Sequence, residues 1–171
     1  IHLKLKSIYS LLEGAIFPKA LAKRCIEFGM PAVGISDRGN LFGALEFSEI
    51  IADHGIQPII GCQLPINLNS ISDNQNNKLR NTSMVFIAKN ELGYSNLINL
   101  SSELYLHETN KLNGLALDKI TDRSDGLICM SGGSEGPINK LFEDTKENLA
   151  RDLTERLKKI FDDRFYLELN R

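Results

Sequence analysis

Tryptophan is absent from this 171-residue chain, and cysteine, histidine and proline are scarce, with three, three and five residues. A zinc site needs about four nitrogen or sulfur ligands, and none of these cysteines and histidines lies within metal-motif spacing of another. Cys25, Cys62 and Cys129 are odd in number and stand among apolar neighbours. This usage predicts buried, reduced thiols in a cytoplasmic protein and argues against a disulfide framework.

Long apolar runs and a basic excess are also missing. No run approaches the ~20 residues that cross a bilayer, and no signal peptide opens the chain, so we expect no membrane association. The net charge of -2 argues against a dedicated nucleic-acid-binding surface, which normally carries a basic excess. The contents of 42% hydrophobic and 25% charged residues exclude wholesale disorder, and the length suits one domain, 1–171.

What is present is an alternation of short apolar runs with longer helical patterns, which is typical of βα units. The predicted strands are Ile1–Lys6, Ala32–Ser36, Pro58–Ile66, Met84–Ala88, Leu127–Ser131 and Phe165–Leu169. The predicted helices are Pro18–Phe28, Leu41–His54, Glu91–Leu106 and Leu149–Phe161. Strand–helix–strand repeats with short connections predict parallel pairing, and the periodicity leaves a doubly wound sheet and a barrel both open.

Further details follow from the same patterns. Asp144 and Glu147 have the spacing of a capping box for the last helix. The third helix is expected to bury Leu97, Ile98, Leu100 and Leu104. The Asn- and Ser-rich stretch 67–81 predicts a mobile surface loop. Because the chain starts at Ile1 in a predicted strand and stops just after another, we expect a fragment of a longer protein.

In parallel βα architectures, functional groups gather where strands end. Those positions hold Lys4, Lys6, Ser7, Glu13, Ser36, Asp37, Arg38, Cys62, Gln63, Ser131, Gly132 and Gly133. A nucleophile beside a base, or a cluster of histidines and carboxylates, is almost absent from this set. The turn 37–40, with Asn40 as a helix N-cap, is either structural or an anion site with Arg38 as its clamp. The turn 131–134 is open to the same two interpretations.

Six segments at these strand ends carry a family resemblance. They are His2–Ser7 with Tyr9–Ala15, Met30–Ala44, Gly55–Cys62, Ala88–Asn90 with Gly93, Tyr94, Asn96 and Leu97, Gly126–Ile128 with Ser131–Gly133, and Tyr166–Leu169. In order and spacing they resemble the polymerase and histidinol phosphatase (PHP) domain. More narrowly, they are similar to the version at the N-terminus of bacterial DNA polymerase III alpha subunits, the C-family replicative polymerases.

The resemblance implies a distorted parallel (β/α)7 barrel of the PHP type, incomplete in this chain. It also implies a parent protein that carries out DNA-template-directed DNA synthesis, with magnesium at a polymerase site outside this chain and DNA bound there rather than here. The implied partners are other replisome subunits, among them the proofreading exonuclease. The implied location is the cytoplasm.

The resemblance also implies a degenerate metal site. At the family's ligand positions this sequence has Lys4, Lys6, Glu13, Arg38, Gln63, Ser83 and Gly133, so only Glu13 keeps a ligand-type side chain. Three cationic residues stand where divalent ions would be held, and at 4 Å one pair of unit charges is worth about 4 kcal/mol at an effective dielectric of 20. We therefore expect a metal-free pocket in which the basic groups pair with Glu13 and with Asp37, and no catalytic residue.

Three alternatives remain at this stage. Lys4, Lys6 and Arg38 could bind a phosphate of DNA or pyrophosphate. The domain could be an active metal-dependent phosphoesterase or 3′–5′ exonuclease, or the chain could be a stand-alone histidinol-phosphatase-like enzyme. The interpretation that the residues favour is a non-catalytic structural and partner-docking module.

Overall fold

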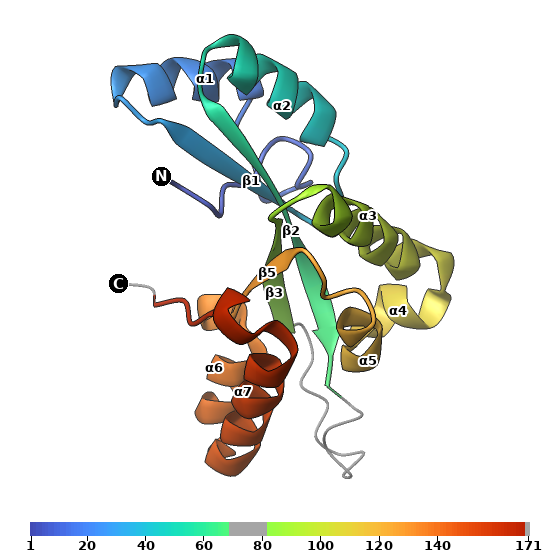
Figure 1. Cartoon of the computed structure of the whole chain (residues 1–171). Coiled ribbons are helices and arrows are strands. Elements are labelled where there is room, and N and C mark those ends of the chain that lie inside the picture. Colours follow the sequence, from blue (N-terminus) through green and yellow to red (C-terminus); the bar gives the residue numbers. More distant parts are fainter. Residues whose placement is uncertain (69–81, 170–171) are drawn as a thin grey trace. The chain divides into compact units, whose positions relative to one another are not determined.

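The structure is a computed structural model that describes residues 1–68 and 82–169. It divides the chain into two compact units, Ile1–Gln63 and Leu64–Arg171, and each is described here by itself (Figure 1). The organisation of the chain as one domain stays a prediction.

The first unit is built from two helices and two parallel strands. Helix α1 (Pro18–Glu27) starts with proline, whose fixed φ suits the first helical position. Strand β1 (Ala32–Arg38), helix α2 (Ala44–Asp53) and strand β2 (Gln57–Asn67) follow. β1 pairs in parallel with the first part of β2, from Ala32 opposite Gln57 to Arg38 opposite Gln63. The predicted βαβ unit is therefore confirmed, with α2 shorter than the sequence suggested.

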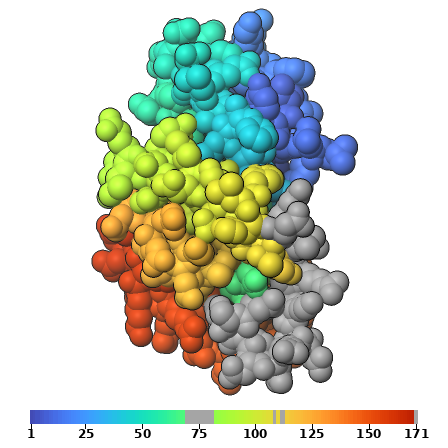
Figure 2. Space-filling view, turned by 90° about the vertical axis from the view of Figure 1, so that its right-hand side faces the viewer, coloured from blue at the N-terminus to red at the C-terminus, as the bar shows by residue number. Residues whose placement is uncertain are grey.

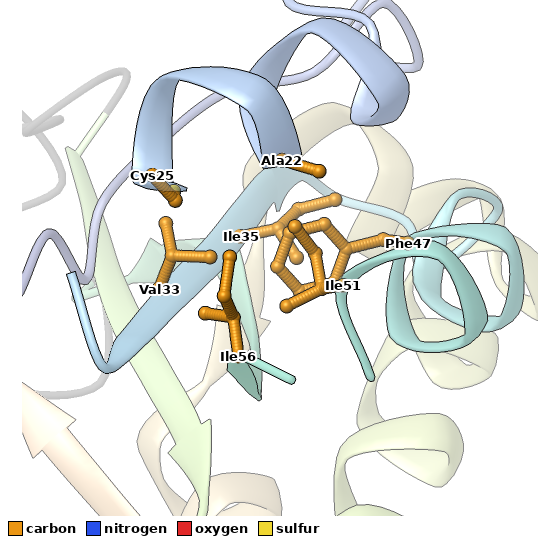
Figure 3. Packing of buried hydrophobic residues seen from close by; sticks show 7 residues of the cluster. All are labelled: Ala22, Cys25, Val33, Ile35, Phe47, Ile51 and Ile56. Atoms are coloured by element: carbon orange, nitrogen blue, oxygen red, sulfur yellow. The ribbon is translucent and has the colours of Figure 1, made fainter. Parts of the chain in front are cut away.

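An apolar cluster joins these elements. Ala22 and Cys25 come from α1, Val33 and Ile35 from β1, Phe47 and Ile51 from α2, and Ile56 directly precedes β2 (Figure 3). All seven are buried, which stabilises by roughly 25 cal/mol for each Å² of apolar surface removed from water. This core packs against β1, whose last residues belong to the candidate site.

The predicted first strand, Ile1–Lys6, is wrong as a regular element. The segment lies beside β1 but forms only an isolated bridge between Leu5 and Ile35. Gly34 and Ser36, two residues apart on β1, donate their amides to the carbonyls of His2 and Leu5, which are three residues apart. This one extra residue interrupts the ladder, as a bulge does.

The second unit contains the rest of the sheet. From Leu64 onward, β2 is followed in spatial order by β3, β5 and β6, while β4 pairs in parallel with β2. The bounds are Thr82–Ala88 for β3, Leu115–Ala116 for β4, Leu127–Met130 for β5 and Phe165–Tyr166 for β6.

The prediction of parallel pairing throughout is wrong for β3 and β5, which are antiparallel, whereas β5 and β6 are parallel. The connection from β3 to β5 is long and contains β4, so either direction of pairing is open to it, and the local sequence pattern could not decide between them. The sheet is mixed and rich in parallel pairs.

Five α-helices and two 3-10 turns cover this sheet or connect its strands in the described part of the second unit. They are α3 (Glu91–Leu106), α4 (Glu108–Asn113), α5 (Leu117–Thr121), α6 (Pro137–Glu143), α7 (Glu147–Phe161) and the 3-10 turns Gly133–Glu135 and Asp162–Arg164. α3 lies on one side of β3 and β5, and the pair α6 and α7 lies on the other (Figure 1). The surface of the segment from α3 to α5 faces the viewer in Figure 2.

Two predicted details of these helices need correction. The capping box at α7 is absent: Lys146 is the N-cap residue and makes no side-chain capping bond, while Asp144 ends α6 and accepts a hydrogen bond from Lys146 Nζ at 2.9 Å. The intervening Thr145 has a φ of 59°, so the chain turns before α7 begins. On α3, Ile98 is exposed rather than buried.

The predicted loop 67–81 falls mainly outside the described residues, apart from Asn67, the last residue of β2, and the buried Leu68. Within the described ranges, the longest apolar helices fall short of what a membrane crossing requires.

Candidate functional site

Glu13 and two cations form the centre of the candidate site in the first unit. One carboxylate oxygen, Oε2, lies 2.5 Å from Lys6 Nζ, and the other, Oε1, lies 2.7 Å from Arg38 Nε. Lys6 comes from the segment beside β1, and Arg38 is the last residue of β1. Of the three basic residues that were expected to pair with Glu13, Lys6 and Arg38 do so.

The two cations change the acidity of the carboxylate. The pKa of Glu13 is lowered from its usual value, chiefly by the hydrogen bond from Lys6 and then by Arg38, while partial burial acts in the opposite direction. The charged form is therefore the stable one near neutral pH. Because the side chain of Glu13 is still 34% exposed, water screens part of this attraction.

Asp37 is buried next to these ion pairs, and the expectation that a basic group would pair with it is wrong, because its partners are two serines. Its carboxylate accepts hydrogen bonds from Ser7 N at 2.7 Å, from Ser7 Oγ at 2.7 Å and from Ser10 Oγ at 2.6 Å. These bonds attach the loop that carries Glu13 to the end of β1. The sequence held one usable signal, since Ser7 and Ser10 flank the segment with short hydroxyl side chains that often bond to a buried acceptor.

The turn after β1 is held by the same loop. Asn40 donates from Nδ2 to the carbonyls of Tyr9 at 3.1 Å and Arg38 at 3.0 Å, and its Oδ1 accepts from Phe42 N. Gly39 has a φ of 68°, a conformation that favours glycine. The prediction of Asn40 as a helix N-cap is wrong, because its side chain closes a turn two residues long and Gly43 is the N-cap of α2.

The adjacent strand supplies Cys62 and Gln63, which are both fully buried. Burial raises the pKa of the Cys62 thiol far above its usual value, and its Sγ lies 3.4 Å from the carbonyl oxygens of Asp37 and Asn40. A protonated, enclosed thiol is a poor nucleophile. Gln63 is opposite Arg38 in the sheet register, and its carbonyl accepts from Gly39 N at 2.8 Å.

The other two predicted positions, Ser83 and Gly133, lie in the second unit. Ser83 Oγ donates to Glu135 Oε2 at 3.4 Å, and a side chain at Gly132 would collide with the Ser83 carbonyl. Ser131 Oγ accepts from Glu168 N at 2.9 Å. The turn 131–134 is thus packed against its neighbours.

Lys4 lies in the first unit, two residues before Lys6 on the same segment.

The donor set around Glu13 does not fit a divalent metal ion. Both oxygens of Glu13 are already engaged by cations, and fixed positive charge repels a second cation. Across residues 1–68 and 82–169, no three histidine, cysteine or carboxylate side chains are grouped as metal ligands. What the arrangement can do chemically is hold an oxyanion between a lysine and an arginine.

The chain belongs to the PHP domain family, because it matches the PHP domain profile over residues 2–171. The relatives it resembles are DNA polymerase III alpha subunits. The subunit of Caulobacter vibrioides is 42% identical over 173 residues, covering 100% of this chain and 15% of that protein. The subunit of Buchnera aphidicola is 35% identical, covering 100% and 14%.

This chain therefore spans about one seventh of the length of these curated relatives. A solved structure from Bifidobacterium adolescentis, assigned as a metal-dependent phosphoesterase, is 13% identical, with a TM-score of 0.43 over 60% of this chain and 32% of its own. That likeness is too slight to support an argument about this site.

Proposed function

We propose that this chain is the N-terminal PHP domain of a DNA polymerase III alpha subunit, whose remaining chain carries out DNA-template-directed synthesis. The proposal is supported by full-length coverage of this chain at 35–42% identity by subunits of that name. The polymerase itself would use magnesium at a site outside these residues. Such a protein would work in the bacterial cytoplasm together with other replisome subunits.

Within that protein, we propose that the domain is a metal-free, non-catalytic module. The observation that carries this proposal is the double ion pair of Glu13 with Lys6 and Arg38. It neutralises the carboxylate that a metal would need and joins the N-terminal loop to the end of β1. The module would then act through its stability and through a docking face for a partner, for which the proofreading exonuclease is the candidate.

The first experiment offers manganese and zinc to the purified protein and measures bound metal and hydrolysis of a phosphomonoester. The expected result is less than stoichiometric metal and no turnover above that of the Glu13→Ala variant. Tight stoichiometric metal with turnover that Glu13→Ala abolishes would replace the module with an active phosphoesterase.

The second experiment concerns the parent protein. Extension of a primed template by the full-length protein should require magnesium, and the Lys6→Ala variant should keep its activity per folded molecule. A full-length protein that never extends a primer would contradict the assignment to a polymerase.

A further inference from the structure

The pocket of Glu13 contains two cationic residues whose backbones are held in place without Glu13. The segment around Lys6 is tied to β1 by a hydrogen bond of 2.8 Å from Ser36 N to the Leu5 carbonyl and by the bond from Ser7 N to Asp37. Arg38 belongs to β1 itself. Because these ties are made by neighbouring backbone and by Asp37, loss of the Glu13 carboxylate would leave the backbones of Lys6 and Arg38 in place, with both side chains still able to reach the space that Glu13 fills.

The carboxylate, by contrast, can leave by a rotation of its own side chain. Its backbone is anchored separately, by the bond from Glu13 N to the Ser10 carbonyl at 3.0 Å, and its side chain is 34% exposed. The carboxylate can therefore move from its position between Lys6 and Arg38 into water. No movement of the strand or of the loop backbone is needed.

We infer that Lys6 and Arg38 form an oxyanion site which the chain closes with its own Glu13 carboxylate. This inference rests on the proposed metal-free state of the pocket and adds its ligand class and its regulation. An arginine and a lysine that bind the two oxygens of one carboxylate present the donors that a phosphate also needs, because both anions offer several oxygens on one centre. An external anion enters only when Glu13 leaves.

Because Glu13 belongs to the same chain, the state in which its carboxylate occupies the site of Lys6 and Arg38 is dominant. A group attached to the same chain competes at an effective concentration in the millimolar range or above. Free phosphate must exceed that value to displace it from the native protein. Removing the carboxylate removes the competitor and keeps both cationic residues on their anchored backbones, so the variant binds anions that the native protein excludes.

The test measures uptake of radiolabelled inorganic phosphate by the full-length protein, using equilibrium dialysis at low ionic strength with a chelator present. Glu13→Ala is expected to bind one phosphate per chain at this site. Its affinity there should be at least tenfold higher than that of the native protein. Glu27→Ala is the matched control. It removes the same charge from an exposed pair of 2.8 Å with Arg24, in which a single cation faces the carboxylate, and should behave as the native protein does.

Further variants locate the site. The double variant Glu13→Ala with Lys6→Met should lose the additional phosphate, and excess acetate should displace it from Glu13→Ala because the site is built around a carboxylate. Uptake that survives the loss of Lys6, or that acetate does not reduce, would contradict the inference. So would the absence of extra uptake in both Glu13→Ala and Glu13→Ser.

Folding does not confound this test. If both variants unfold, recovery of the folded state by phosphate supports the site, and failure to recover counts against it. Failure here is also separable from failure of the proposed function. Bound metal in the native protein would overturn the metal-free module, whereas a metal-free protein whose variants ignore phosphate would overturn the oxyanion site alone.

Discussion

At the scale of single residues, Glu13 and Asp37 show how two nearby carboxylates can have different roles. Glu13 is partly exposed and is balanced by Lys6 and Arg38. Asp37 is buried and is satisfied by three neutral donors of Ser7 and Ser10. The first contributes charge pairing that depends on pH, and the second contributes the geometry that brings the loop to β1.

The contribution of Glu13 to stability should depend on pH. Its folded pKa is lowered, so the stabilisation is complete above the usual glutamate pKa of ~4.3 and disappears as the pH falls through the lower folded value. Glu13→Gln should therefore reduce the free energy of unfolding at pH 7 by about 1 kcal/mol or less, because screening limits exposed pairs. Urea unfolding from pH 7 to pH 3 would show this difference closing.

Glu27→Gln is again the control for that series. Both partners in its pair are more than half exposed, so its effect should be smaller at every pH. If the difference in unfolding free energy between the native protein and Glu13→Gln grows on acidification, the ion pairs do not lower the pKa of Glu13, and the prediction is wrong.

Asp37→Ala should be the more damaging change. It leaves the Ser7 amide and two hydroxyl groups without their buried acceptor, which costs about 3 kcal/mol of unfolding free energy when buried donors lose a charged partner. Chemical denaturation of the variant and of Asp53→Ala, which truncates an exposed carboxylate, provides the comparison. Equal stabilities would mean that water replaces Asp37 without loss.

At the scale of elements, the beginning of α3 depends on two glycines. Asn90 caps this helix by accepting from Gly93 N at 2.9 Å, and Gly126, just before β5, lies directly against this first turn. A side chain at either glycine would collide with the other segment. The close approach joins the helix to the strand it covers.

Gly126→Ala tests this contact, with Gly55→Ala as its control. Both glycines have a φ of +71°, but a Cβ at Gly55 meets nothing within 4 Å, while one at Gly126 meets Asn90 and Gly93. Gly55→Ala should cost about 1 kcal/mol for its backbone conformation. Gly126→Ala should cost a further 1–3 kcal/mol, roughly the penalty for overpacking. Similar thermal melting shifts for the two variants would remove the packing argument.

Elements with a long apolar period were the predictable ones. Glu91–Leu106 has the bounds that the sequence predicted, and α7 buries Leu153, Leu157 and Phe161 as its stripe required. The short helices α4, α5 and α6 were not predicted, because five to seven residues contain too few turns for a period to show.

At the scale of the whole molecule, the proposed metal-free state leads to a prediction about chelators. Dialysis of the 171-residue chain against EDTA should leave its thermal midpoint unchanged within about 1 °C, since no bound ligand is lost from the folded state. Differential scanning calorimetry before and after dialysis measures this. A fall of several degrees, restored by manganese or zinc, would show that a metal stabilises the fold.

The candidate site was predictable only in part. The family resemblance implied that metal-ligand positions are held here by Lys6, Arg38 and Gln63, and the charges indicated that Glu13 would be paired with cations. The sequence did not show that Asp37 accepts hydrogen bonds from Ser7 and Ser10, because a carboxylate can bind a cation or a hydroxyl group equally well. Which of the two partners it binds depends on which one lies within hydrogen-bond distance, and the fold sets that distance.

The sequence by itself determined the family, the α/β character and the longer helices, since these are set by side-chain chemistry and by periods within one segment. Only the tertiary structure decided that Ile1–Lys6 pairs irregularly, that β3 and β5 are antiparallel, and which hydroxyls reach Asp37. These features depend on which distant segments meet and in what register. That outcome is set by the packing of the entire chain, and no local pattern encodes it.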